Sequence, residues 1–480
     1  MARRFAGKRG GEIAWRDLPV VVVGLGSSGR AAARRLVGLG ANITAVDDKP
    51  AAQFGEALVD LQAMGCVLRL GGADPSALRG AGLVIVSPGV PPSHPVIAAA
   101  LGAGIDVWSE VELACRFIAC PMLAVTGTNG KTTTTHLLAA MCQAGGRRTL
   151  AGGNIGTPLV EVAFSAGSPE LVVAEISSFQ LEFVEDFWAA AGVLLNVADD
   201  HLDWHGSFSA YEQTKARVWQ RQTSADAAVF NAEDPVATKL GERASGWPTP
   251  FRTTEPNAGE VGVAEGFVVS RLTGRAQRIW EIGTLRPAGR HNLSNAIAAT
   301  ACALHAGIPS AAIASAVAAF ESQPHRVEPV AEVDGVLFVN DSKGTNPHAA
   351  LAAIEGFPRV IWIAGGRNKG LSFDDLVGRS AERIAGAVVI GEAAPDLVRA
   401  LAAAGVAPVD AASSMGEAVR RAFAMARPGD TVLLSPACAS QDMFEDYRER
   451  GRVFRAAVES LVVAVASRSS VGESSGTGMS

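Results

Sequence analysis

The sequence predicts an α/β protein made of three successive units, each built around a mainly parallel sheet. Short apolar runs alternate with helix-compatible stretches along almost the whole chain, which is typical of helices packed on parallel strands. Three of these runs end in glycine-rich turns, near Gly24, Gly127 and Gly365, and so indicate three α/β units in series. A length of 480 residues also exceeds one ordinary domain.

The expected strands are the apolar runs between glycine turns and helical stretches. They cover residues 19–24, 42–47, 83–87, 122–126, 171–176, 192–196, 227–231, 336–340, 360–364, 386–390 and 431–435. The segment 241–286 is less regular and carries Pro, Gly and Thr between short strand-like pieces, which is consistent with an antiparallel insertion. The Ser/Gly-rich tail from Ser467 onward predicts disorder.

Composition and charge exclude several classes of protein. The net charge of −6 argues against a nucleic-acid-binding surface, which requires a basic excess. No apolar run approaches the roughly 18–20 residues that span a bilayer, and no signal-peptide core follows the basic N-terminus. The six cysteines are scattered without a C-x-x-C pair, so we expect neither zinc nor disulfides and place the chain in a reducing cytoplasm.

The run 125–133, VTGTNGKTT, is the most informative motif. An apolar strand leads into it and a helix-compatible stretch, 133–143, leaves it. Such a turn directs backbone N–H groups and a helix N-terminus toward a phosphate, with Lys131 reaching the outer phosphates and Thr132 able to hold Mg²⁺. Only two residues separate Gly127 from Gly130, where the usual phosphate loop has four. The motif predicts binding of ATP or GTP.

A second glycine motif, GLGSSG at 24–29, follows the first expected strand. Asp47 and Asp48 end the next strand about 20 residues on, which completes a dinucleotide-binding fingerprint. An NAD-dependent oxidoreductase is therefore one alternative. The motif supplies backbone N–H groups and a helix N-terminus, which bind a diphosphate. A UDP-sugar would therefore fit as well as NAD. The turn at Ser87–Gly89 ends another strand, where ligands bind in open α/β sheets.

The second unit places acids near the phosphate loop. Glu175 ends an apolar strand, the usual place for a Mg²⁺ ligand, although a capping or solvated glutamate is equally compatible. A denser Asp/His cluster, 199–203, follows the next strand and indicates metal or acid–base chemistry. The glycine loop 152–156 is suited to close ligand approach. By its spacing, Lys215 reads as an ordinary exposed lysine in the helical stretch 211–220.

The third unit carries three polar loops after expected strands. The loops are 340–347, NDSKGTNP, 364–369, AGGRNK, and 434–444, LSPACASQDMF. Each alone is compatible with a plain turn. Together, their lysines and hydroxyls at equivalent strand ends favour a small anionic substrate.

The complete set of motifs resembles the Mur ligase family, and within it the members that add D-glutamate. The resemblance runs from about Pro19 to Ser467. It rests on GLGSSG, SPGV, TGTNGKTT, GGNIG, EISSFQLE, NVADDHLDWHG, YEQTK, GRHNLSNA, PHRVE, NDSKGTN, GGRNK and SPACASQDMF. The shortened phosphate loop is itself typical of this family.

The resemblance implies three domains and an ATP-dependent amide synthesis in the cytoplasm. Residues 1–117 correspond to a UDP-sugar-binding Rossmann-like domain with an extension at 1–18. Residues 118–322 correspond to a central ATP-binding domain, 323–467 to a Rossmann-like amino-acid-binding domain, and 468–480 to a disordered tail. The implied substrates are ATP, UDP-N-acetylmuramoyl-L-alanine and D-glutamate, and the implied reaction passes through an acyl phosphate. We expect a monomer whose third domain rotates about a hinge near 320–325.

The resemblance also implies roles for individual residues. Contacts to the UDP-sugar fall on Gly26, Ser27, Ser28, Asp47, Asp48, Ser87 and Gly89, with Asn154 on the phosphate side. Contacts to ATP fall on Gly127, Thr128, Asn129, Gly130, Lys131, Thr132, Thr133, Asn231, His291, Asn292, Asn295, Arg326 and Asp341. Two Mg²⁺ ions are implied, with Thr132, Glu175, His201 and a Lys215 carbamylated by CO₂ as ligands, and Lys131, Glu175, His201 and Lys215 as the catalytic set. D-glutamate is implied at Lys343, Thr345, Lys369, Ser440, Gln441 and Tyr447.

Two further alternatives belong to other classes. Another amino-acid-adding ligase, such as folylpolyglutamate synthase, would share the phosphate loop, but the glycine motif of the first unit argues against the folate enzyme. A non-catalytic nucleotide sensor would not require Glu175, His201 and Lys215 together. The oxidoreductase alternative leaves the phosphate loop and the third unit without a role.

Overall fold

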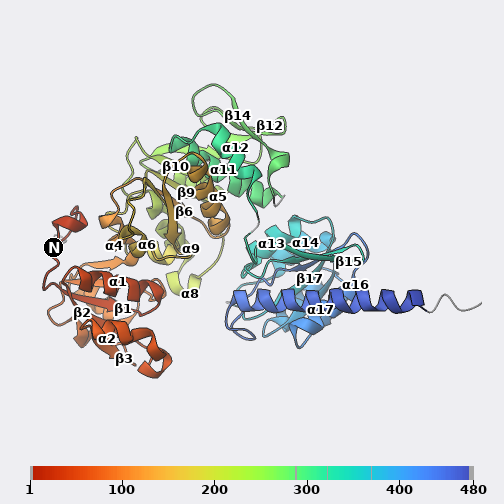
Figure 1. The fold of residues 1–480 in the computed structure, drawn as a ribbon, viewed down its shortest axis with the longest axis horizontal. Helices are drawn as coiled ribbons and strands as arrows, with labels where there is room; N and C mark the ends of the chain where they lie inside the picture. The colour runs from red at the N-terminus through yellow and green to blue at the C-terminus, as the bar shows by residue number, and fades with distance from the viewer. Residues whose placement is uncertain (1–3, 287–288, 322, 369, 475–480) are drawn as a thin grey trace, which may run out of the picture. The chain divides into compact units, whose positions relative to one another are not determined.

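The computed structural model describes residues 4–286, 289–321, 323–368 and 370–474, in three domains that each contain a mainly parallel sheet (Figure 1). The first two sheets lie in one compact unit, and the third sheet lies in a second unit that begins at Glu321 apart from two short segments, 198–200 and 286–292. This architecture confirms the predicted fold class. The described part of the chain contains no helix with the length and hydropathy of a membrane span.

The first domain is a five-stranded parallel sheet in the order β3-β2-β1-β4-β5. Its strands are β1 (Pro19–Val23), β2 (Asn42–Asp47), β3 (Val67–Leu70), β4 (Leu83–Val86) and β5 (Val107–Ser109), and its helices are α1 (Ser27–Gly38), α2 (Val59–Ala63), α3 (Pro95–Gly102) and α4 (Glu110–Phe117). The buried runs β1, β2 and β4 were predicted. The edge strands β3 and β5 were not, because β3 is half-exposed and β5 is only three residues long.

The central domain is a nine-stranded sheet in the order β14-β13-β12-β11-β10-β9-β6-β8-β7. Its strands are β6 (Met122–Thr126), β7 (Thr149–Gly153), β8 (Leu171–Glu175), β9 (Ala191–Leu194), β10 (Ala227–Asn231), β11 (Trp247–Phe251), β12 (Val261–Ala264), β13 (Phe267–Ser270) and β14 (Gln277–Glu281). The segment expected to be an antiparallel insertion forms β11 to β14, of which β12, β13 and β14 pair antiparallel and β11 pairs parallel.

The central domain also contains helices. They are α5 (Lys131–Ala144), α6 (Leu159–Ala163), α7 (Ser178–Leu181), α8 (Leu202–His205), α9 (Phe208–Ala216), α10 (Pro235–Gly241), α11 (Arg290–His305) and α12 (Ser310–Ala318). One hydrophobic cluster joins α5, α11 and α12 to one face, while α6, α7 and α9 contribute to the cluster on the other.

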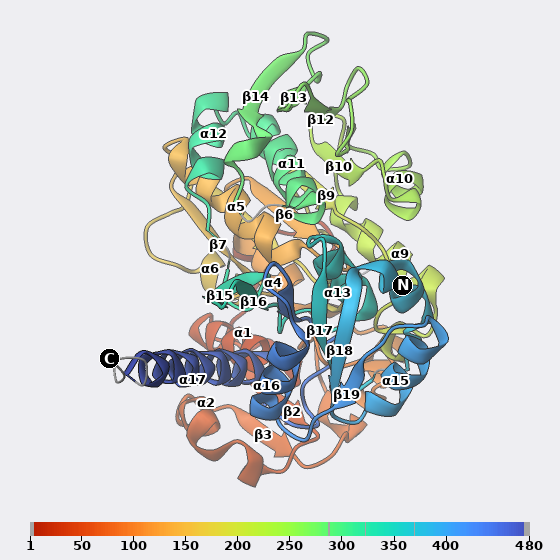
Figure 2. The same cartoon turned by 90° about the vertical axis from the view of Figure 1, so that its right-hand side faces the viewer.

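The third domain is a six-stranded sheet in the order β15-β16-β20-β17-β18-β19, antiparallel only between β15 and β16 among the described strands. Its strands are β15 (Glu328–Val333), β16 (Val336–Asn340), β17 (Val360–Gly365), β18 (Ile384–Ile390), β19 (Val409–Ala411) and β20 (Thr431–Leu434). Its helices are α13 (Pro347–Glu355), α14 (Asp374–Ser380), α15 (Ala394–Ala403), α16 (Met415–Met425) and α17 (Tyr447–Ser474). Helices α16 and α17 lie on one face of this sheet, opposite α13 and α15 (Figure 2). Helix α14 belongs to the same hydrophobic cluster as α13 and α15.

Helix α17 extends further than the sequence predicted. It continues through Ser474, so the expected disorder is wrong for residues 468–474, and residues 475–480 lie outside the described part of the chain. The physical reason is that each residue added to an existing helix gains a backbone hydrogen bond without a new nucleation cost.

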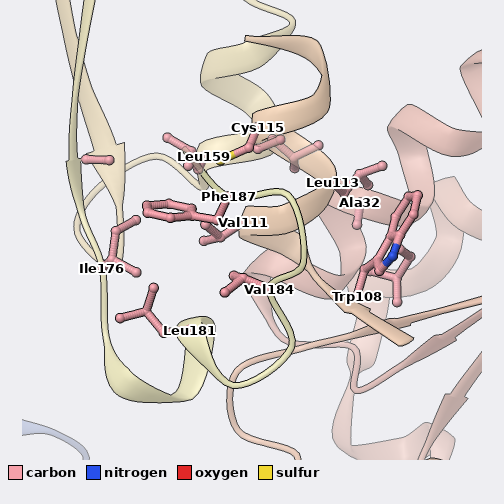
Figure 3. Packing of buried hydrophobic residues seen from close by; sticks show 14 of the residues in the cluster. Ala32, Trp108, Val111, Leu113, Cys115, Leu159, Ile176, Leu181, Val184 and Phe187 are labelled. Atoms are coloured by element: carbon pink, nitrogen blue, oxygen red, sulfur yellow. The ribbon is translucent and has the colours of Figure 1, made fainter. Parts of the chain in front are cut away.

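The first and central domains share a hydrophobic core rather than packing as separate bodies. Val111, Leu113 and Cys115 of α4 belong to the same buried cluster as Leu159 of α6 and Phe187, which precedes β9 (Figure 3). The junction between the two domains is therefore itself a core. A core of this kind fixes the two domains more firmly than a polar domain interface would.

The N-terminal extension is part of this junction. Arg116 of α4 donates to the carbonyl oxygens of Phe5 and Lys8, at 2.7 and 2.8 Å, and forms an ion pair with Asp186 of the central domain at 3.0 Å. The Gly7 N–H donates to the same Asp186 carboxylate at 2.6 Å. The extension thus contacts both domains, which the sequence did not indicate.

We expect Phe5→Ala to destabilise the compact unit formed by the first two domains. Phe5 is 3% exposed and its ring meets Trp108 edge-on at 5.5 Å. Truncating a buried phenylalanine leaves a cavity and costs about 3 kcal/mol. Thermal and urea unfolding measure the loss. Lys8→Ala is the matched control, because its exposed side chain is removed while its carbonyl contact remains. Equal stability of both variants would show that the extension is dispensable.

Candidate active site

The loop between β6 and α5 has the geometry of a phosphate-binding turn. Gly127 and Gly130 both have positive φ, 153° and 85°, and Gly130 caps α5. A Cβ on Gly130 would lie 2.2 Å from Oδ1 of Asn295 on α11, and L side chains rarely adopt a φ of 85°, so this position favours glycine. Helix α5 begins at Lys131, and the N–H groups and dipole at a helix N-terminus favour an anion.

Side chains from later strands hold the loop in place. The Asn129 N–H donates to Oδ1 of Asn196 at 2.9 Å, and Nδ2 of Asn196 donates back to the Asn129 carbonyl at 3.1 Å. The hydroxyls of Thr128 and Tyr211 are 3.0 Å apart. Asn231, at the end of β10, donates to the Leu195 carbonyl at 3.1 Å. The loop is thus pre-organised by its surroundings.

Two lysines meet at one backbone carbonyl of this loop. Nζ of Lys131 donates to the Gly127 oxygen at 2.9 Å, and Nζ of Lys215 donates to the same oxygen at 2.8 Å. Lys215 is 1% exposed, so its interpretation as an ordinary exposed lysine is wrong. Its place on the same face of α9 as the buried Tyr211, four residues earlier, is the sequence signal that would have indicated burial.

Glu175 ends β8 close to the glycine loop. It is 2% exposed, and its Oε1 accepts from Nδ2 of Asn154 at 2.7 Å. Its Oε2 is buried and, among the residues that the structure describes, has no hydrogen-bond partner. A Cβ on Gly153 would lie 2.4 Å from the Glu175 carbonyl, so this strand end requires glycine opposite it. A buried carboxylate oxygen without a protein partner is a fitting ligand for a cation.

His201 lies at the start of α8 with a left-handed backbone, φ 55°. Its ring packs edge-on against Phe179 at 4.7 Å, and the neighbouring His205 accepts from or donates to the Ser178 hydroxyl at 3.0 Å. Within the described ranges, no three His, Cys, Asp or Glu side chains form a ready metal site.

The first domain repeats the strand–turn–helix pattern at 24–29. A Cβ on Gly29 would lie 1.8 Å from the Gly24 carbonyl, which explains the third glycine of the motif. The Asp47 carboxylate accepts from the N–H groups of Leu25 and Lys49 at 2.7 and 2.9 Å, so it braces the turn. Asp48 lies 3.3 Å from Nε2 of His94. Of the other predicted residues here, Gly26, Ser27 and Gly89 are exposed, Ser28 is half-buried and Ser87 is buried.

In the third domain, the predicted residues lie on loops after β16, β17 and β20. Nζ of Lys343 lies 3.7 Å from the centre of the Tyr447 ring. Ser440 is 2% exposed and Gln441 is exposed, while Thr345 precedes α13. Lys369 lies outside the described residues. Arg450, which the sequence did not indicate, is buried beneath these loops.

The remaining predicted nucleotide contacts fall into both compact units. Thr132 and Asn295 are buried in the unit that holds the phosphate loop, where Thr133 is half-buried. His291, Asn292, Arg326 and Asp341 belong to the unit of the third domain. Burial, followed by the neighbouring His348 and Arg326, lowers the pKa of His291 to about 4. His291 is therefore neutral at pH 7.

Asp341 provides a pH-dependent prediction. Burial raises the pKa of its carboxyl to about 7, against hydrogen bonds from Ser435 and Val327 that favour the charged form. The unfolded chain then releases this proton near pH 4, while the native state keeps it until about pH 7. The contribution of Asp341 to the free energy of unfolding is therefore fully present below pH 4 and is lost as the pH rises toward 7.

We expect Asp341→Asn to remove this contribution to the pH dependence, which is on the order of a few kcal/mol. Urea unfolding at pH 5 and at pH 8 measures it as the difference between wild type and variant at each pH. Parallel stability curves for the two proteins would contradict the assignment.

The fold and these loops define an α/β protein with a phosphate-binding turn after a central strand of its middle domain. Family models match along the chain: a Mur ligase MurD-like N-terminal domain at 19–109, a Mur ligase middle domain at 125–303 and a Mur ligase glutamate ligase domain at 325–438. The chain belongs to the Mur ligase family.

Curated relatives support this assignment over nearly the whole chain. The UDP-N-acetylmuramoylalanine–D-glutamate ligase of Frankia casuarinae is 46% identical over 93% of this chain and 95% of its own length. The enzyme of the same name from Streptomyces avermitilis is 42% identical over 93% and 99%. The enzyme from Pelotomaculum thermopropionicum is 44% identical over 92% and 97%.

Solved structures share the fold at low identity. A pseudomurein peptide ligase type C from Methanothermus fervidus has a TM-score of 0.58 at 18% identity, covering 92% of this chain and 100% of its own. The UDP-N-acetylmuramate-alanine ligase MurC from Thermotoga maritima has a TM-score of 0.56 at 18% identity, covering 92% and 99%. These likenesses establish the three-domain fold.

Proposed function

We propose that this protein is an ATP-dependent ligase that joins D-glutamate to UDP-N-acetylmuramoyl-L-alanine, in cytoplasmic synthesis of peptidoglycan precursors. The observation that carries the proposal is the identity of up to 46%, over nine-tenths of the chain, to ligases of this name. The pre-organised phosphate loop, with Lys131 and Lys215 at one carbonyl, supports it.

The reaction must first activate a poor acyl donor. The carboxylate of the L-alanine group attacks the γ-phosphorus of ATP, a bond to the β–γ bridging oxygen breaks, and ADP leaves. The N–H groups around Gly130 and the ammonium of Lys131 are the groups that stabilise the charge of the transferring phosphoryl group. The product is an acyl phosphate.

Magnesium, when bound, would offset the phosphate charge. Glu175 is suited to hold it because the Oε2 atom is buried and has no partner among the described residues. Thr132 and His201 complete the proposed protein ligands. Lys215 joins this set only as a carbamate, formed when its neutral amine attacks CO₂ and loses a proton, because an ammonium would repel the ion.

D-glutamate then supplies the nucleophile. Its neutral amine attacks the acyl carbon, and the nitrogen of the adduct loses a proton. The tetrahedral intermediate then collapses, the bond to the phosphate oxygen breaks, inorganic phosphate leaves, and an amide remains. We place its two carboxylates near Lys343, Thr345, Lys369, Ser440, Gln441 and Tyr447. Three substrates on three domains must be brought together, so a hinge near 320–325 is part of the proposal.

The test is phosphate release from ATP with UDP-N-acetylmuramoyl-L-alanine, Mg²⁺ and bicarbonate. D-glutamate, L-glutamate, L-lysine or no amino acid is added in parallel. Release that requires D-glutamate supports the proposal and its stereochemistry. Release with another amino acid would retain the ligase mechanism and overturn the assignment of the third domain. No release from folded protein would overturn both.

A further inference from the structure

Arg450 is a fully buried arginine in the first turn of α17, outside the set of residues assigned to substrates. It is 0% exposed, although arginine is almost never fully buried unless it is paired. It lies on the same helix face as the buried Phe454 and Val458, four and eight residues on. An apolar side chain would normally occupy such a position, so the guanidinium requires an explanation.

The guanidinium connects loops that follow three neighbouring strands. Nη2 donates to the Ser342 carbonyl at 2.8 Å and Nε to the Ser342 hydroxyl at 3.0 Å, on the loop after β16. Nη1 donates to the carbonyls of Cys438 and Ala439, at 3.1 and 3.4 Å, after β20. It also lies 3.4 Å from the carbonyl of Gly365, the last residue of β17. These strands are adjacent in the order β16-β20-β17.

Two of the residues that accept from Arg450 are chain neighbours of residues proposed to hold D-glutamate. Ser342 precedes Lys343, and Ala439 precedes Ser440. Backbone hydrogen bonds between Arg367 and Ala439, at 2.9 and 3.0 Å, join the loops after β17 and β20 directly. The Ser342 hydroxyl also donates to the Tyr447 carbonyl at 2.8 Å, so the loop after β16 is hydrogen-bonded to the first residue of α17.

The hydrogen bonds around Arg450 require the shape of an arginine side chain. A guanidinium presents five N–H donors in a rigid plane, so one side chain can serve several carbonyls in fixed directions. Lysine carries the same charge at a single point and cannot reach acceptors on three loops at once. Glycine at 366 fits the same geometry, since a Cβ there would lie 2.1 Å from the Ala439 carbonyl and 3.2 Å from Nη1.

We propose that Arg450 is a positioning residue, which holds the three loops of the third domain at the spacing that the carboxylates of D-glutamate require. This inference rests on the proposed function of the same loops. Displaced loops should weaken the binding of D-glutamate alone and so raise its KM. A loss of folded protein would instead lower kcat and leave every KM unchanged.

The kinetic test compares Arg450→Lys and the milder Ser342→Ala with Arg455→Lys. The control is an arginine on the same helix that pairs with Glu328. We expect Arg450→Lys to raise the KM for D-glutamate roughly tenfold or more, since a displacement of about 1 Å can cost about a hundredfold. Ser342→Ala should raise it less, and the KM for the UDP-linked substrate should not change in either variant. A lower kcat with unchanged KM values would overturn the inference.

Hydrogen–deuterium exchange tests the inference without any activity. In Arg450→Lys, faster exchange is expected together in peptides covering 341–346, 365–368 and 436–442. Faster exchange confined to α17, or no change in the three loops, would overturn it. If the wild-type protein fails to use D-glutamate but the three loops loosen together, the proposed function is wrong and the structural role of Arg450 stands.

Discussion

Replacing Lys215 with arginine is expected to lower kcat by at least about a hundredfold. Arginine keeps a positive charge near the Gly127 carbonyl, but its guanidinium does not form a carbamate. If the carbamate is a magnesium ligand, its loss removes several kcal/mol of transition-state stabilisation, and each 1.36 kcal/mol is about tenfold in rate. Steady-state phosphate release measures kcat.

The physical reason lies in how Lys215 and Lys131 are placed. Both ammonium groups donate to one carbonyl oxygen, and Lys215 is 1% exposed, so two like charges share a buried site. Converting the Lys215 amine to a carbamate would replace this repulsion by attraction. Carbon-13 NMR with labelled bicarbonate should show a carbamate signal in wild type that Lys215→Arg lacks.

The matched control for this variant is Lys239→Arg. Lys239 lies on α10, pairs with Glu212 at 2.7 Å and has a side chain that is 48% exposed. It should keep wild-type activity. An active Lys215→Arg protein would contradict the proposed carbamate.

Glu175→Gln is expected to lose most of its activity while remaining folded. The substitution keeps the size of the side chain and its contact with Asn154, but it removes the negative charge from an oxygen that has no partner among the described residues. Affinity for Mg²⁺ should fall, and kcat should fall by about a hundredfold or more. The free energy of unfolding should change by only about 1 kcal/mol, because the wild-type carboxylate is itself poorly satisfied.

Titration of activity against Mg²⁺ concentration, together with urea unfolding, separates these two effects. Glu281→Gln, an exposed position on β14, serves as the control. A Glu175→Gln protein that is strongly destabilised, or one that keeps its Mg²⁺ dependence, would show that Glu175 has a structural role instead.

The sequence predicted the fold well where burial leaves a strong signal. Strands such as β6 and β8 are buried on both faces, so they appear as continuous apolar runs bounded by glycine. The strands β3 and β5 lack such runs, and the helix from 468 to 474 carries no apolar repeat that would distinguish it from a tail.

The site was predicted less completely, for a different physical reason. Loops at strand ends can be recognised in the sequence because they favour glycine, as at Gly130 beside Asn295. Arg450 and the burial of Lys215 depend on which helix face packs inward, and a long basic side chain on that face resembles a surface residue in sequence. The contribution of the N-terminal extension depends on backbone carbonyls, which carry no sequence signal.

Isotope transfer is the most direct test of ligation through an acyl phosphate. UDP-N-acetylmuramoyl-L-alanine is prepared with heavy oxygen in its alanine carboxylate and turned over with ATP and D-glutamate. Mass spectrometry of the products should show one heavy oxygen in the released phosphate and a glutamyl residue added to the UDP-linked product. Phosphate without heavy oxygen, formed together with that product, would contradict activation of the carboxylate by phosphoryl transfer.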